Sequence, residues 1–144
     1  MTVDYMYKTT EGNKPWAIRN IKLVFSRKLM YAGGLFSVGM TADRNRLEKV
    51  NILCELFALP VIPRIQKLCG EVQAERVVTS YEKFLEKMQL GAVREALKKI
   101  EPGDHSDATF RELKNEGHNF NRALLSLFET TFHSTHPLRR SVIF

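Results

Sequence analysis

The stretch TFRELKNEGHNFNRALLSL, residues 109–127, shows the clearest helical pattern in the chain. Its apolar residues and one glycine recur at alternating spacings of three and four, so they share one face of an α-helix. These residues are Phe110, Leu113, Gly117, Phe120, Leu124 and Leu127. Thr109 and Glu112 have the spacing of a capping box and predict the start of the helix, and Pro137 predicts its end. We therefore expect a long helix with one buried face.

A second helix with the same periodicity is predicted over residues 16–36. Its buried face would carry Ile18, Ile21, Phe25, Leu29, Ala32 and Phe36. The opposite, solvent-facing arc would hold Arg19, Lys22, Ser26 and Arg27. Lys28 falls among the apolar positions, so it must reach past them or find a polar partner. Gly33-Gly34 predicts either a kink or the close approach of another backbone.

Shorter apolar repeats predict the helices between these two. The first begins near Thr41 and Asp43 and ends before Pro60, and a short helix follows over residues 63–70. The apolar stripe of the first comprises Leu47, Val50, Leu53, Cys54, Leu56 and Phe57. A longer helix comes next, is interrupted at Gly91 and then continues. Its apolar positions are Val77, Tyr81, Phe84 and Met88, followed by Val93, Leu97 and Ile100.

The length and composition fit one globular domain. The chain has 144 residues, of which 44% are hydrophobic and 26% charged, which excludes the disordered and fibrous classes. We expect an all-α, single-domain bundle of about four or five helices over residues 1–144, with an arm or loop at 1–15 and a short tail at 138–144. The longest weakly polar run, residues 29–40, is shorter than the ~20 residues of a transmembrane helix. The N-terminus shows no signal-peptide pattern, so we expect an intracellular, cytoplasmic protein.

Positive charge is concentrated in the first part of the chain. The net charge is +6, and no acidic residue occurs between Glu11 and Asp43. This acid-free segment predicts a nucleic-acid-binding helix in which cations contact phosphates; they are Lys14, Arg19, Lys22 and Arg27. Trp16 and Tyr31 could stack on bases if they are exposed. A basic face that is simply solvated is the alternative.

The end of the chain suggests a different role. Val142, Ile143 and Phe144 are apolar and poorly suited to solvent at a free C-terminus, so they predict docking, either on the bundle or on a partner. A protein-protein interaction or regulatory subunit, with another protein or a second copy as partner, is therefore an alternative to nucleic-acid binding. A component that uses both surfaces within a larger assembly combines the two.

Motifs for metal, cofactor or nucleotide chemistry are weak or absent. Cys54 and Cys69 stand fifteen positions apart, unlike the close pairs of zinc sites, and His133 and His136 lie near a helix end. No glycine-rich phosphate loop and no nucleophile elbow occurs. The sequence therefore predicts no metal, no cofactor and, in the main reading, no catalytic residues.

One local motif points to catalysis. Arg111-Glu-Leu-Lys-Asn-Glu-Gly-His118 resembles the Arg-x4–6-His pattern of HEPN-type helical ribonucleases. The resemblance covers eight residues and implies a metal-independent ribonuclease, in which His118 moves the proton of a 2′-hydroxyl and Arg111 stabilises the phosphate. Glu112 stands where the family commonly has a small polar residue. We keep this activity as a second alternative.

Overall fold

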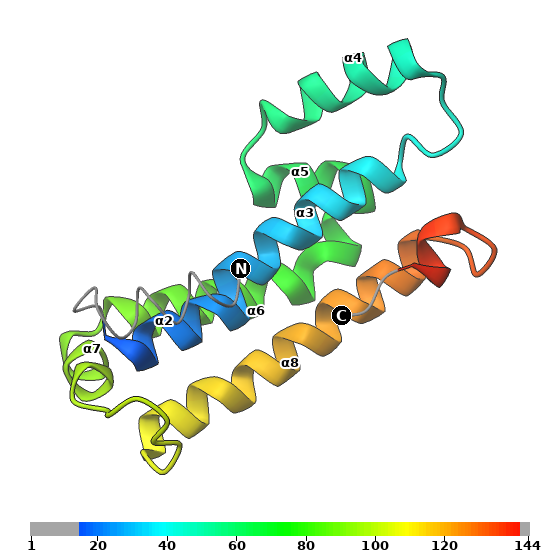
Figure 1. Cartoon of the computed structure of the whole chain (residues 1–144). Helices are drawn as coiled ribbons and strands as arrows, with labels where there is room; N and C mark the ends of the chain where they lie inside the picture. The colour runs from blue at the N-terminus through cyan, green and yellow to red at the C-terminus, as the bar shows by residue number, and fades with distance from the viewer. Residues whose placement is uncertain (1–14, 142–144) are drawn as a thin grey trace.

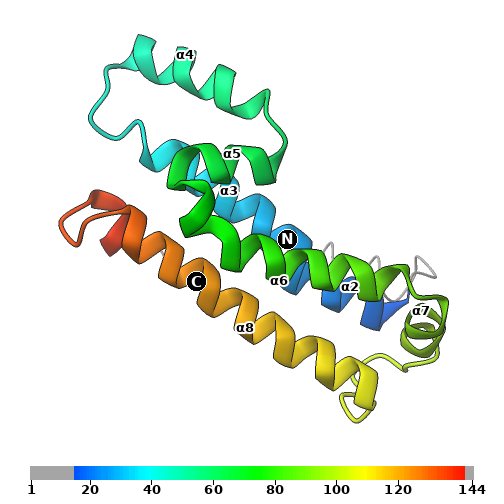
Figure 2. The same cartoon turned by 180° about the vertical axis from the view of Figure 1, so that it is seen from behind.

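The computed structural model describes residues 15–141 and is all-α in that range, which confirms the predicted fold class. Figures 1 and 2 show the helices from opposite sides. The elements are α2 (Trp16–Lys22), a π-helical turn η1 (Leu23–Arg27), α3 (Lys28–Gly39), α4 (Arg46–Phe57), α5 (Val61–Cys69), α6 (Glu71–Gln89), α7 (Gly91–Lys98), α8 (Ala108–Thr131) and a 3-10 turn η2 (Pro137–Arg140). The predicted arm, residues 1–15, lies outside the described range except for Pro15, as do residues 142–144 of the predicted tail.

The body of the molecule is a bundle of α2–α3, α6 and α8 (Figures 1 and 2). The segments α2, η1 and α3 form one continuous rod that runs parallel to α8, and α6 runs antiparallel to both. Phe25 occupies the centre, with its ring stacked on Phe84 at 4.3 Å and 5.3 Å from Phe120. All three rings are buried, as the periodicity predicts. The predicted longer helix is divided into α6 and α7 near Gly91, also as expected.

The π-helical turn changes which residues of the rod face solvent. A π-helix bonds from i to i+5, so its wider turn rotates the following side chains relative to an α-helix. Ser26 lies in this turn and its hydroxyl is 3.0 Å from that of Tyr81 on α6. The prediction that Ser26 shares the solvent-facing arc is therefore wrong. Lys22 and Arg27 remain exposed on either side of it.

The predicted capping box of α8 is also wrong. The helix begins at Ala108, and Asp107 caps it by accepting a hydrogen bond from the backbone N–H of Phe110 at 2.9 Å. Glu112 instead faces α6, where the ammonium group of Lys87 lies 2.6 Å from its carboxylate and 2.5 Å from that of Glu116. Lys87 of α6 therefore binds the Glu112 side chain, which the predicted capping box would have used.

Helix α4 begins later than predicted and lies away from the bundle. Asn45 and Glu48 form its capping box, whereas Thr41 is buried and donates to the carbonyl of Val38. Figure 1 shows α4 projecting beyond α3 and α5. Leu56 is its one buried residue. A compact bundle would have buried the whole apolar stripe, but the main neighbours of α4 are α3 and α5, and Leu56 is the stripe residue buried there.

The glycine pair in α3 permits a close approach. A Cβ added at Gly33 would lie 2.6 Å from a methyl group of Val61 on α5, whereas Gly34 has open space around it. The helix continues through both glycines to Gly39. Of the two alternatives predicted for Gly33-Gly34, a close approach is observed at Gly33 alone, and a side chain of α5, that of Val61, makes it instead of the predicted backbone. Within residues 15–141, no helix combines the length and apolarity needed to cross a bilayer.

Candidate nucleic-acid interface

The residues predicted to bind nucleic acid lie along the N-terminal rod. Lys22 near the end of α2 and Arg27 at the end of η1 are exposed, and neither forms an ion pair or hydrogen bond with any residue in the range 15–141. Arg19 is partly exposed on α2, and Lys14 lies outside the described residues. Lys22 and Arg27 therefore present their charges to solvent.

The two candidate stacking residues differ in exposure. Trp16 is half-buried, and its ring lies 5.3 Å from those of both His105 and Phe110. It therefore packs against the start of α8 and closes that end of the core. Tyr31 is exposed, one turn beyond Arg27 on the same rod. Of the pair, Tyr31 is the aromatic side chain that a base could reach.

The rod and α8 pack against each other along a line that we call the seam. Two lysines lie in this seam. Lys28 donates from Nζ to Oδ1 of Asn121 at 2.6 Å, and Lys114 donates from Nζ to Oδ1 of Asn20 at 3.0 Å. Between these contacts the backbones approach closely, because a Cβ at Gly117 would collide with Val24. Lys28 thus finds the polar partner that its position in the sequence requires.

Both seam lysines have lowered pKa values and no ion-pair partner among residues 15–141. Burial lowers the pKa of Lys28, and the charge of Lys114 lowers it further. Burial also lowers the pKa of Lys114. Within the described part of the chain, neither ammonium group has an acidic group at ion-pair distance. Each ammonium carries three N–H donors and uses one on an amide oxygen, so donors remain for water or an anion.

Charge is segregated around α8. Next to the seam, α8 has an exposed face that carries two arginines and a histidine, namely Arg111, His118 and Arg122. These positions share one helical face with Lys114, since they lie three, four and eight residues from it. The acids Glu112 and Glu116 occupy the other side, where Lys87 binds them. Over residues 111–122, the seam side of α8 is therefore basic.

Sequence reasoning identified Lys28 but missed Lys114, Asn20 and Asn121. The two residues of each lysine–asparagine pair stand 93 or 94 positions apart in the sequence, so no local pattern links them. A weak signal did exist. Lys114 directly follows a core position, Leu113, which puts a long cationic side chain at the edge of the buried face, as for Lys28.

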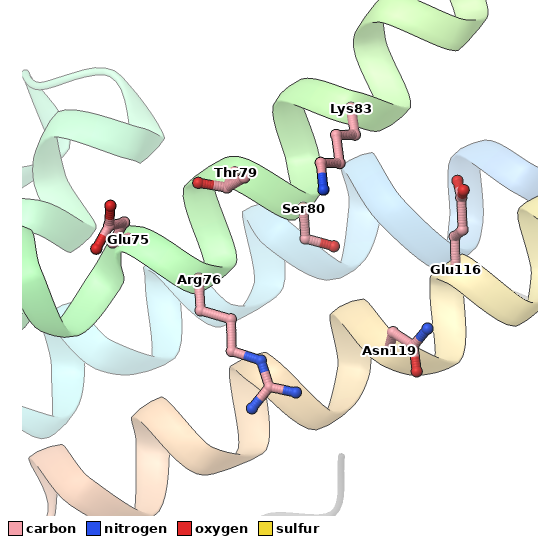
Figure 3. Close-up of a pocket in the computed structure, with 7 residues that line it drawn as sticks. All are labelled: Glu75, Arg76, Thr79, Ser80, Lys83, Glu116 and Asn119. Atoms are coloured by element: carbon pink, nitrogen blue, oxygen red, sulfur yellow. The ribbon is translucent and has the colours of Figure 1, made fainter.

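A polar groove lies on the opposite flank, between α6 and α8 (Figure 3). It encloses about 520 Å³ and is lined by Glu75, Arg76, Thr79, Ser80, Lys83, Glu116 and Asn119. Its walls carry both acids and bases, with neutral polar side chains between them. Its mixed charge favours no single ligand.

The cysteines and histidines are dispersed or occupied by structural contacts. Cys54 is exposed on α4, and Cys69 is partly buried at the end of α5, where burial raises the pKa of its thiol. His136 lies with Nε2 3.0 Å from the carbonyl oxygen of Gly39, and its Nδ1 accepts from the backbone N–H of Leu138 at 3.2 Å. Across residues 15–141, no group of three or more His, Cys, Asp or Glu side chains has the geometry of a metal site.

The residues of the ribonuclease-like motif are both on the surface. Arg111 and His118 are exposed on α8, and no residue of the described range accepts a hydrogen bond from either side chain or donates one to it. Among the described residues, no group orients His118 as a base. Val142, Ile143 and Phe144 lie outside the described residues.

Comparison with known proteins gives no further guide to this site: no family model, curated protein or solved structure matches the chain.

Proposed function

We propose that this protein is a non-catalytic helical component that binds nucleic acid through the N-terminal rod. The observation that supports the proposal best is that Lys22 and Arg27 are exposed and free of carboxylate partners within the described range. Cations that the fold does not neutralise can exchange their counterions for phosphates. Arg19 and Lys14 extend the same contact, and the setting is the cytoplasm.

The expected recognition is of the nucleic-acid backbone. The rod packs against α5, α7 and α8, so we do not expect it to enter a groove as a recognition helix. Phosphate contacts position a protein without reading sequence. Tyr31 adds a stacking surface that tolerates any base. We therefore expect binding that is weakly dependent on sequence and strongly dependent on salt.

A charge-matched pair of variants tests this proposal. Lys22→Gln/Arg27→Gln removes two cations from the rod, and Lys67→Gln/Lys83→Gln removes two exposed cations from α5 and α6. Fluorescence anisotropy with a labelled single-stranded oligonucleotide should show roughly tenfold weaker binding for the first pair, because exposed charge contacts contribute up to about 1 kcal/mol each. Equal affinity of the two double variants contradicts the proposal.

The exposed stripe of α4 favours a second candidate function, protein-protein interaction. Leu47, Val50 and Phe57 are 71%, 52% and 48% exposed, on a helix that projects from the bundle. Exposed apolar faces of this kind mark interaction surfaces in soluble proteins. Multi-angle light scattering of the wild type and of Leu47→Glu/Val50→Glu tests self-association: a dimer that becomes a monomer supports this function, and a monomer in both cases shows that the stripe does not join two copies.

A further inference from the structure

The seam between the rod and α8 contains two partly desolvated ammonium groups that no acidic residue of the range 15–141 neutralises. Burying a charge costs free energy unless it is paired. Lys28 and Lys114 are partly buried, yet among the residues that the structure describes the ammonium group of each is bonded to an asparagine amide alone, Asn121 and Asn20 respectively. Both pKa values are lowered accordingly, and the charge of Lys114 acts on Lys28. An anion in the seam would relieve this cost.

The asparagines fix the spacing of the two cations. Lys114 is level with Asn20 on the parallel rod, and Asn121 lies seven residues further along α8. A rise of 1.5 Å per residue separates the two ammonium groups by about 10 Å along the seam. One inorganic phosphate cannot contact both at hydrogen-bonding distance. A chain of phosphates that passes along the seam can contact both.

Neighbouring cations make the seam continuous with the rod. Arg27 immediately precedes Lys28 and is exposed, so it lies between Lys22 and the seam. On the other side of the seam, His118 and Arg122 follow Lys114 along the exposed face of α8. Two acids of α8, Glu112 and Glu116, face the opposite flank, and the third, Glu129, lies beyond this stretch with its carboxylate 3.8 Å from Arg139. A polyanion at the seam therefore meets cationic side chains on both helices.

We propose that the seam of Lys28 and Lys114 is a phosphodiester-binding site, and that a nucleic-acid strand crosses from the rod onto α8 there. This inference rests on the proposed function and adds to it the α8 half of the interface. The two asparagines act as positioning residues, since each holds a lysine side chain extended and leaves donors free for phosphate oxygens.

Lysine acetylation read by mass spectrometry tests the site in the wild-type protein. A single-stranded oligonucleotide should lower the acetylation rates of Lys28 and Lys114 by at least roughly threefold, with Lys67 on α5 as the unprotected internal reference. Orthophosphate at the same total phosphate concentration should protect neither, because of the spacing. Equal protection by orthophosphate would mean separate single-anion sites and would overturn the proposed track.

A variant pair provides the second measurement. Lys28→Gln/Lys114→Gln should bind the oligonucleotide roughly five- to tenfold more weakly than the charge-matched Lys67→Gln/Lys83→Gln, with circular dichroism confirming equal helicity. If the oligonucleotide binds the wild type but leaves both seam lysines unprotected and the seam variant unweakened, the seam proposal fails and the proposed function stands. If the wild type does not bind at all, both fail.

Discussion

Arg64 donates a hydrogen bond from Nε to the carbonyl oxygen of Leu56, 2.9 Å away. Leu56 belongs to the last turn of α4, where carbonyl groups have no partner within the helix. The Nη2 atom of Arg64 also donates to the carbonyl of Leu59 at 2.8 Å, and its guanidinium lies 4.9 Å from the centre of the Phe57 ring. A buried arginine on α5 therefore terminates α4 and holds the projecting helix to the body.

Replacing this arginine should loosen α4 selectively. Arg64→Met keeps much of the side-chain volume but removes the side-chain donor to the carbonyl of Leu59 and one of the two donors to that of Leu56, which keeps the backbone N–H of Leu59, at a cost of about 2 kcal/mol in the free energy of unfolding. Urea denaturation should show that loss, and hydrogen exchange should accelerate in α4 more than in α8. Arg76→Met, at an exposed position on α6, is the control. Unchanged exchange in α4 would contradict this role of Arg64.

The adjacent glycines of α3 should respond oppositely to alanine. At Gly34 there is open space, so Gly34→Ala should raise the free energy of unfolding by up to about 1 kcal/mol through helix propensity. At Gly33 a Cβ would lie 2.6 Å from Val61, so Gly33→Ala must displace α5 and should be less stable than Gly34→Ala. Thermal denaturation of both variants checks this order, and a Gly33→Ala protein as stable as Gly34→Ala would show that the packing of α3 on α5 is loose.

The two long periodic segments were predictable because their pattern is local. The buried faces of α8 and of the N-terminal rod follow directly from spacings of three and four. The π-helical turn at Leu23–Arg27 was not predictable, since it depends on the packing of Ser26 against Tyr81. The N-cap of α8 was placed two residues too late, at Thr109, because Asp107 takes that role by accepting a hydrogen bond from the backbone N–H of Phe110.

The candidate site was predictable only in its N-terminal half. An acid-free run of cations is visible in the sequence, and the exposure of Lys22 and Arg27 agrees with it. The contribution of α8 depends on contacts across 93 and 94 residues, which periodicity does not encode. The exposure of the α4 stripe was missed for a similar reason: an apolar face shows what could be buried, not whether a neighbouring element covers it.

The lowered pKa of Lys28 should give stability a specific pH dependence. In the folded state burial and Lys114 hold this pKa below its ordinary value of 10.5, which applies to the unfolded chain. Between the two values the unfolded state binds more protons, so this group makes the free energy of unfolding rise with pH there. The Lys28→Gln variant lacks this effect. Its free energy of unfolding, relative to that of the wild type, should therefore be greatest near neutral pH and should decline toward pH 10.5. Urea denaturation at several pH values measures the difference; a constant difference would contradict the assignment.

The ribonuclease alternative has its own direct assay. Because the proposed function is non-catalytic, labelled RNA should remain intact with the wild type and with His118→Ala. The assay is gel electrophoresis after prolonged incubation with a metal chelator present. Cleavage by the wild type that is lost in His118→Ala would show that Arg111 and His118 are catalytic and would overturn the non-catalytic proposal.

The salt dependence of oligonucleotide binding tests the central claim most directly. Each phosphate contact to a single strand contributes about −0.7 to the slope of log K against log salt concentration. For the wild type we predict that log K decreases linearly with log salt concentration. The slope should be shallower by about 1.4 for Lys22→Gln/Arg27→Gln and unchanged for Lys67→Gln/Lys83→Gln. Binding that does not change with salt, or the same slope in all three proteins, would contradict the claim.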